Sequence, residues 1–367
     1  MRWSFPVGRL FNIPIRVHYT FLLLLAFIWY AESTILGPEA GFHSVVFWAL
    51  IFLCVLFHEL AHSLVAKSYG LTIASIILLP IGGVSQITEI PRDPAKEVGI
   101  TIAGPASNFV IAGILLLFGK SFYPSLQFSE ISLQSPSTLV NLFWANVMLG
   151  LFNVIPAYPM DGGRILRGIL AMKKEYLEAT RLAADVGKLF AIAFIVAGFF
   201  YNWWLILIGI FVFSGASSEV ESATLSSRLE KISVSDLMIT DFKTISPDEP
   251  ITAVVEKSLH IFQNDFPVVS DGKFVGILTR SALIESLHHR LHETKVSEIS
   301  VKSFPTVSSE ETAAEALTRL RTARVSIAPV EDEGVFKGII TVEKLLEASD
   351  VFSDAVSPGH ETTDSKK

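Results

Sequence analysis

Residues 41–66 read GFHSVVFWALIFLCVLFHELAHSLVA, an apolar stretch that contains the pentapeptide His58-Glu59-Leu60-Ala61-His62. A helix of this length crosses about 30 Å of hydrocarbon. Residues four apart lie on one face of a helix, so both imidazoles can meet one metal ion, with Glu59 beside it as a base for water. Ionisable side chains inside a membrane are costly and are kept mainly for function. The pattern therefore predicts a metal site; the alternative is an interfacial His/Glu cluster without a metal.

The composition of the whole chain predicts an integral membrane protein. Hydrophobic residues make up 50% of the 367 residues and charged residues 18%, against about 25% charged in soluble domains. Lys and Arg collect in the loops after the second and fourth apolar segments, which predicts that both termini are cytoplasmic; the plasma membrane of a prokaryote is the expected location. About six transmembrane helices are expected, in residues 17–31, 40–66, 98–119, part of 131–160, a segment beginning near Arg181, and 203–217.

Residues 70–91, GLTIASIILLPIGGVSQITEIP, do not fit a helix. They are apolar and rich in β-branched residues, but Pro80 and Gly82-Gly83 interrupt them. Non-helical backbone at membrane depth is found only where protein or a water-filled cavity satisfies its polar groups. The segment predicts a membrane-dipping β-hairpin beside an aqueous site, with a juxtamembrane amphipathic loop as the alternative.

A third metal ligand is expected from another span, because catalytic zinc takes three protein ligands and a water. Asp161 is the only acidic residue in 131–174, and it falls where the fourth span should reach the cytoplasm. Pro156 and Pro159 unwind the chain just before it. We expect Asp161 to join the two histidines; a plain interfacial turn is the alternative. Cys54, one turn before His58, is a conceivable sulfur ligand, but a buried packing thiol is the favoured interpretation.

The C-terminal part has the composition of an ordinary soluble protein and contains a repeat. Residues 229–367 carry 15 basic and 23 acidic side chains, so the charge gives no case for nucleic-acid binding. Two segments align without a gap at an offset of 62 residues, which indicates two copies of one supersecondary unit. The expected division is a transmembrane domain at 1–222, a linker at 223–233, a repeat module at 234–350 with copies at 234–287 and 296–349, and a disordered tail at 351–367.

Both copies contain a Gly-apolar-apolar-Thr element, at Gly276–Thr279 and Gly338–Thr341. These features resemble tandem CBS domains, which implies a soluble α+β module that often forms a homodimer. The resemblance also implies an adenine nucleotide held by an Asp three residues after each Thr. Here those positions are Ala282 and Lys344, so a packing or dimerisation module without ligand is an equal alternative.

The motifs of the membrane part resemble the site-2 protease family of intramembrane metalloproteases, in the branch with C-terminal CBS repeats. The resemblance rests on the His58–His62 motif, the N-x-x-P…D-G element from Asn153 to Gly162, and the Gly-Gly hairpin. It implies that His58, His62 and Asp161 bind Zn²⁺, that Glu59 activates water and that Asn153 holds the substrate carbonyl. Residues 104–108 also resemble a family element, which we expect to allow close helix packing.

The expected function is therefore an intramembrane zinc endopeptidase that hydrolyses a peptide bond in a transmembrane or membrane-proximal substrate helix. The Gly82-Gly83 strand would pair with the unwound substrate, and the CBS module would modulate activity. The rival is a CBS-regulated membrane transporter or channel. Transporters usually contain two related halves, and residues 1–228 show no internal repeat.

Overall fold

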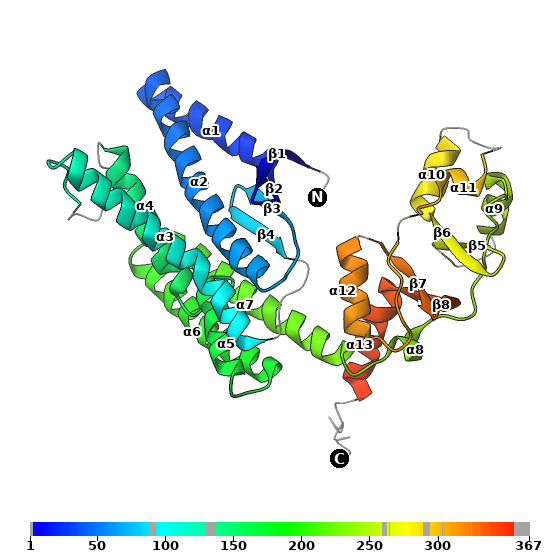
Figure 1. The fold of residues 1–367 in the computed structure, drawn as a ribbon. Coiled ribbons are helices and arrows are strands. Elements are labelled where there is room, and N and C mark those ends of the chain that lie inside the picture. The colour runs from blue at the N-terminus through cyan, green and yellow to red at the C-terminus, as the bar shows by residue number, and fades with distance from the viewer. Residues whose placement is uncertain are drawn as a thin grey trace, which may run out of the picture. The chain divides into compact units, whose positions relative to one another are not determined.

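The computed structural model describes residues 3–87, 93–128, 137–258, 263, 265–288, 294–302, 304–323 and 325–355. The chain divides into two units, Met1–Ala223 and Thr224–Lys367 (Figure 1). The first unit is mainly helical with one small sheet. The second contains two similar α+β repeats.

Five helices of the described chain are long and apolar enough to cross a membrane, and a sixth apolar helix is shorter. The prediction of a multi-span helical membrane protein is confirmed. The fourth predicted span is the 17-residue α4, and a separate helix, α5, begins at Asp161. The helices that begin in this unit are α1 (Tyr19–Leu36), α2 (Pro38–Ser68), α3 (Pro94–Phe122), α4 (Thr138–Val154), α5 (Asp161–Ala171), α6 (Tyr176–Phe200) and α7 (Trp204–Leu229).

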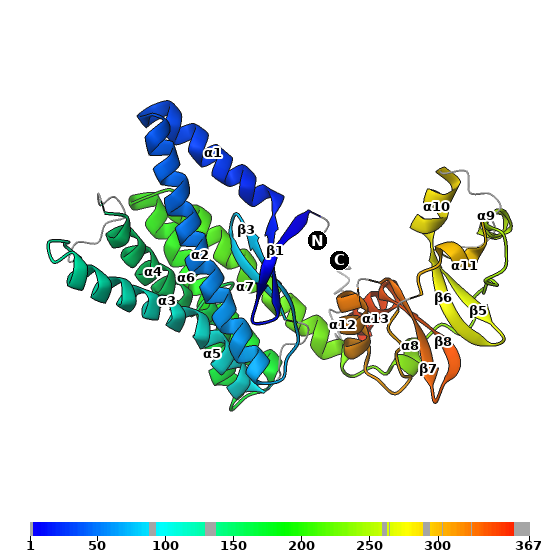
Figure 2. The ribbon, with the colours of Figure 1, turned by 45° about the horizontal axis from the view of Figure 1, so that its top comes forward.

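A four-stranded sheet packs against α1 and α2 (Figure 2). Its order is β1 (Ser4–Leu10), β2 (Ile13–His18), β3 (Ile73–Leu79), β4 (Gly82–Ile87), with β2 and β3 parallel and the other pairs antiparallel. The hairpin predicted in residues 70–91 is therefore β3–β4, although residues 88–92 lie outside the described part. The sequence reading missed the β1–β2 hairpin, because two Pro and one Gly within it weaken the local signal.

The strand β2 shows why this sheet forms. Ile13, Ile15 and Val17 alternate with more exposed residues and are all buried, which is the period of a half-buried strand. They pack in one cluster with Phe21 of α1 and with Phe52, Leu56 and Leu60 of α2. The sheet is thus fixed to the end of α2 that carries the His motif.

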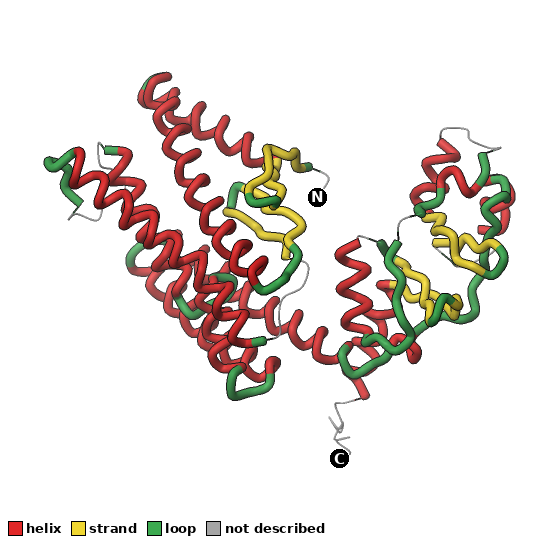
Figure 3. Tube along the Cα trace, viewed as in Figure 1, coloured by secondary structure: helices red, strands yellow, loops and turns green. Residues whose placement is uncertain are grey.

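The second unit contains two matching repeats (Figure 3). Each has a two-stranded antiparallel hairpin with the same irregularity in its register, and each turn uses an acidic residue and a Gly at positive φ. The helices and strands are α8 (Val234–Leu237), α9 (Ile251–Ser258), β5 (Asp265–Ser270), β6 (Lys273–Thr279), α10 (Arg280–His288), α11 (Val296–Ile299), α12 (Ala313–Ala323), β7 (Ile327–Asp332), β8 (Val335–Thr341) and α13 (Val342–Ala355).

Two segments at the ends of this unit carry more helix than the sequence predicted. The expected linker 223–233 is helical through Leu229, because that side chain is fully buried in the core of the second repeat. The expected disordered tail begins as helix, since α13 continues to Ala355. Residues 356–367 lie outside the described part.

Candidate metal centre

The two histidines of the His58–His62 motif occupy one face of α2. Both side chains are buried, and their Nε2 atoms lie 3.1 Å apart. Because they are separated by one helical turn, the helix alone brings them together. The far side of each ring is held by a neighbour on α3. Nδ1 of His62 donates to the backbone oxygen of Ile100 at 2.7 Å, and Nδ1 of His58 lies 2.6 Å from Oδ1 of Asn108.

Asp161 joins the histidines from the start of α5. Its Oδ2 lies 3.1 Å from Nε2 of His58 and 3.2 Å from Nε2 of His62. The helix break after α4 makes this possible, because the chain turns back on itself before α5. Gly162 is required there, since a Cβ at this position would overlap the backbone oxygens of Val154 and Ile155. Within the described residues, His58, His62 and Asp161 are the group that could hold a metal ion.

The three ligand atoms have the chemistry of a zinc site. When both Nδ1 atoms donate hydrogen bonds, the two Nε2 atoms of neutral imidazoles present lone pairs to each other and to a carboxylate. Such an arrangement is repulsive without a cation between the atoms. Ligand atoms around tetrahedral zinc lie about 3.3–3.6 Å apart at the usual bond lengths, close to the distances here.

Gly104 of α3 lies directly against the two imidazoles. A Cβ on Gly104 would overlap the Nε2 atoms of His58 and His62. The sequence reading assigned residues 104–108 to close helix packing. The structure adds that α3 approaches the imidazoles so closely at Gly104 that no side chain fits there, and that Asn108 contacts a candidate ligand directly.

Glu59 lies between the His motif and the sheet. Its Oε2 accepts a hydrogen bond from the backbone N–H of Ser85 at 3.1 Å, so it faces the edge strand β4. A Cβ on Gly83 would overlap the Glu59 side chain, which explains the glycine in this strand. The carboxylate is therefore held at the strand edge next to the histidines.

Asn153 and Cys54, which the sequence also suggested for the site, make their hydrogen bonds to groups outside the cluster of candidate ligands. Asn153 lies in the last turn of α4, half-buried, and its Nδ2 donates to the backbone oxygen of Leu149 at 3.0 Å rather than to the cluster. Cys54 is buried and its Sγ accepts a hydrogen bond from Nδ2 of Asn146 at 3.3 Å. The cysteine thus sits outside the group of candidate metal ligands.

A buried ion cluster that the sequence reading missed anchors α5. Arg167 is one of the basic residues that follow the fourth apolar segment, where the sequence predicted a cytoplasmic loop, yet only 1% of it is exposed. Its Nε donates to Glu97 of α3 at 2.8 Å and its Nη1 to Glu219 of α7 at 2.5 Å. The rings of Tyr158 and Tyr176 lie 5.6 and 4.8 Å from the guanidinium carbon. Acidic residues within apolar helices were the available signal for this cluster.

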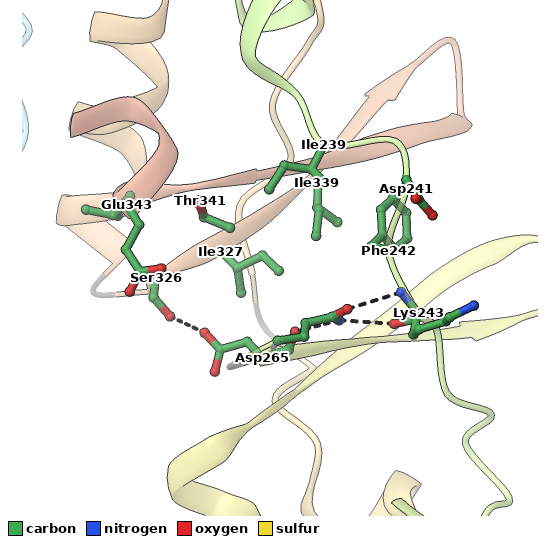
Figure 4. Close-up of a pocket in the computed structure, with 12 residues that line it drawn as sticks. Ile239, Asp241, Phe242, Lys243, Asp265, Ser326, Ile327, Ile339, Thr341 and Glu343 are labelled. Carbon is green, nitrogen blue, oxygen red and sulfur yellow. Dashed lines mark hydrogen bonds between the residues drawn. The ribbon is translucent and has the colours of Figure 1, made fainter. Parts of the chain in front are cut away.

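The second unit contains a cleft of about 400 Å³ between its repeats (Figure 4). Three carboxylates and one ammonium group are among its lining groups, from Asp241, Asp265, Glu343 and Lys243. Asp265 accepts a hydrogen bond from Ser326 of the other repeat at 2.5 Å.

The threonines of the two repeated Gly-apolar-apolar-Thr elements cap helices. Oγ1 of Thr279 accepts from the N–H of Ala282, and Oγ1 of Thr341 accepts from the N–H of Lys344. The repeated motif therefore has a local structural role whether or not a ligand binds.

Comparison with known proteins identifies the family. The model of peptidase family M50 matches residues 46–132 and 126–194, and the CBS domain model matches 234–289 and 296–350. A zinc metalloprotease of Methanocaldococcus jannaschii is 36% identical over 357 residues, which cover 96% of this chain and 98% of the relative. The chain belongs to peptidase family M50.

The chain is also similar to two further proteins. Stage IV sporulation protein FB of Bacillus subtilis is 27% identical over 133 residues, 36% of this chain and 43% of that protein. The solved structure of the site-2 protease of M. jannaschii is 36% identical in sequence. The alignment covers 66% of this chain and 99% of that structure, with a TM-score of 0.43. The resemblances to site-2 proteases and tandem CBS domains are confirmed. This M50 peptidase is a membrane-embedded zinc metalloprotease, and the matches favour it over the transporter or channel.

Proposed function

We propose that His58, His62 and Asp161 bind the catalytic zinc ion of this intramembrane endopeptidase. The observation that carries the proposal is the convergence of their three ligand atoms within 3.2 Å of one another. When bound, zinc supplies Lewis acidity that polarises a peptide carbonyl and acidifies water.

Glu59 then acts as the general base. It follows His58 directly in the sequence and lies beside the cluster, where it can take a proton from the attacking water and pass it to the leaving amine. Asn153 donates to the carbonyl oxygen as negative charge develops there. An amide nitrogen carries two N–H groups, so the bond to Leu149 leaves one donor for the substrate.

The substrate is a transmembrane or membrane-proximal helix that unwinds locally. A helix hides its peptide bonds in its own hydrogen bonds, whereas an extended segment can add to a sheet edge. The strand β4 is the last strand of the sheet, so its outer edge is available for an added strand. Its proximity to Glu59 supports pairing of the scissile segment with this edge.

The cleavage site then lies near the cytoplasmic leaflet. Basic residues follow the second and fourth spans, which supports cytoplasmic termini and a location in a prokaryotic plasma membrane.

The CBS module has a regulatory role in this proposal, and it supports a homodimer. An adenine nucleotide remains a prediction for its cleft. Ala282 and Lys344 occupy the positions where the family places the ribose-binding Asp, and the carboxylates of the cleft oppose a polyphosphate.

The activity can be tested without knowing the natural substrate. A synthetic single-span peptide with a helix-breaking Pro near one end, flanked by a fluorophore and a quencher, is reconstituted with the full chain in liposomes. The wild type should cleave it, and Glu59→Gln should lose about 10²–10⁴-fold in rate while keeping its zinc. An equally active Glu59→Gln variant contradicts the mechanism, and ion flux without cleavage supports the transporter.

A further inference from the structure

A chain of buried amides leads from His58 across α3 to α4. Oδ1 of Asn108 lies 2.6 Å from Nδ1 of His58, and Nδ2 of Asn108 donates to Oδ1 of Asn146 at 3.1 Å. Nδ2 of Asn146 donates in turn to the backbone oxygen of Leu142 at 2.9 Å. Both Asn side chains are completely buried. Buried amides in membrane helices are costly unless they are hydrogen-bonded, and both of these amides have such partners.

The end of this chain fixes the orientation of Asn146. A backbone carbonyl oxygen can only accept hydrogen bonds, so the group that faces the oxygen of Leu142 must be the NH₂ of Asn146. The amide oxygen of Asn146 consequently points the other way, toward Asn108. A flipped Asn146 would place two carbonyl oxygens against each other in a buried site, which costs a hydrogen bond and adds repulsion.

The orientation of the Asn146 amide determines which nitrogen of His58 carries the hydrogen. Because the amide oxygen of Asn146 only accepts, Asn108 must present its NH₂ to it and its own oxygen to the imidazole. That oxygen also only accepts, so Nδ1 of His58 must carry the hydrogen. The second nitrogen, Nε2, is then left with a lone pair facing Asp161 and His62.

We propose that Asn146 is a positioning residue that sets the tautomer of His58 through Asn108 and thereby tunes zinc affinity. It touches neither the cluster nor the substrate side of the site in the described contacts. His62 needs no such relay, since the carbonyl oxygen of Ile100 fixes its tautomer directly. The inference rests on the proposed role of His58 as a zinc ligand.

The simpler role for these amides is to hold three helices together, because hydrogen bonds between membrane helices contribute to their association. The two roles differ in what a carboxylate at position 108 should do. A carboxylate accepts but does not donate, so it forces Nδ1 of His58 to donate whatever residue occupies position 146. If the amides only hold the helices together, the same combination should not help, because Leu at position 146 removes the contacts of this side chain with Asn108 on α3 and Cys54 on α2.

The test measures zinc affinity of the detergent-purified full chain by competition with a chromophoric chelator. Asn146→Leu should weaken zinc binding about 10–100-fold, the usual cost of losing an outer partner of a metal ligand. The double variant Asn108→Asp/Asn146→Leu should regain wild-type affinity. Cys54→Ala, which removes the other contact of Asn146, should leave affinity unchanged because it is not on the path to His58.

Imidazole ¹⁵N shifts of His58 in the metal-free protein give a second reading that does not depend on affinity. The wild type should show hydrogen on Nδ1, and Asn146→Leu a mixture of tautomers. Wild-type affinity in Asn146→Leu, or a double variant as weak as Asn146→Leu, overturns the inference. A His58→Ala variant that binds zinc like the wild type overturns the proposed ligand set itself, so the two failures are distinguishable.

Discussion

The metal centre and the CBS cleft differ in how their polar groups are held. In the membrane unit, His58, His62 and Asp161 lie close together, and buried groups hold the two imidazoles by hydrogen bonds. Arg167 forms ion pairs with two carboxylates. In the CBS unit, the charged groups of the cleft line an opening between the two repeats. A polar group costs little at a surface and much inside a membrane. Buried polar residues in the first unit therefore have specific partners that show their roles, whereas the cleft residues do not by themselves identify a ligand.

The largest effect is expected from Gly104→Ala. An added Cβ would overlap the Nε2 atoms of both proposed histidine ligands, so we expect the purified variant to contain no zinc and to have no measurable protease activity. In an ordinary helix, Gly→Ala increases stability by about 0.5–1 kcal/mol, so lost zinc in a folded variant would point to the site itself. Gly113, whose Cβ would meet nothing within 4 Å, provides the matched control as Gly113→Ala. A Gly104→Ala variant with full zinc content would show that the metal centre is not as tightly packed as the contrast with the CBS cleft requires.

Arg167→Met tests the ion cluster that anchors α5. Removal of one member leaves Glu97 buried without its partner, which should lower the free energy of unfolding by about 3–5 kcal/mol. Thermal unfolding in detergent measures this loss. The double variant Arg167→Met/Glu97→Leu should recover much of it, because no buried charge is then left on α3. A double variant less stable than Arg167→Met would show that the guanidinium acts by packing instead.

Asn153→Ala separates catalysis from metal binding. The loss of one donor to a developing oxyanion lowers kcat about 10²–10³-fold, and we expect a decrease of this size with unchanged zinc content. Peptide cleavage in liposomes and elemental analysis measure the two quantities on the same preparation. Loss of zinc in this variant would show instead that Asn153 supports the cluster.

The smallest effect is expected in the CBS unit, at Asp332. Hydrogen bonds from Ser309, Lys337 and Ser308 hold the pKa of this carboxyl well below its usual range. A carboxyl whose pKa is lowered by folding stabilises the folded state at neutral pH. This stabilisation is lost progressively as the pH falls below the pKa of Asp in the unfolded chain, about 3.9.

Hydrogen exchange of residues 325–341 in the full chain can measure this contribution. Asp332→Asn should reduce protection at pH 7, and the difference from wild type should shrink in acid. Asp271→Asn, in the turn of the first repeat, is the control that should change little. A difference that stays constant down to acidic pH would contradict the assignment to Asp332.

The sequence was enough to predict that His58, His62 and Asp161 come together, because the pattern that points to each of them is either local or nearly unique in its segment. Helical spacing places His58 and His62 together, and Asp161 is the only acid in a long apolar segment. It did not predict Asn108 with Asn146, or Arg167 with Glu219, because such pairs depend on how separate helices pack. It also did not predict the β1–β2 hairpin, because Pro and Gly weaken the local strand signal there and the pairing of β2 with β3 depends on residues far along the chain.

The most direct test of the central claim is the zinc content of the detergent-purified full chain by elemental analysis. We predict about one zinc ion per chain in the wild type and in Glu59→Gln, and none in His58→Ala or Asp161→Ala. Zinc that persists in both of these ligand variants, or its absence from wild type purified without chelators, would contradict the three-residue metal site.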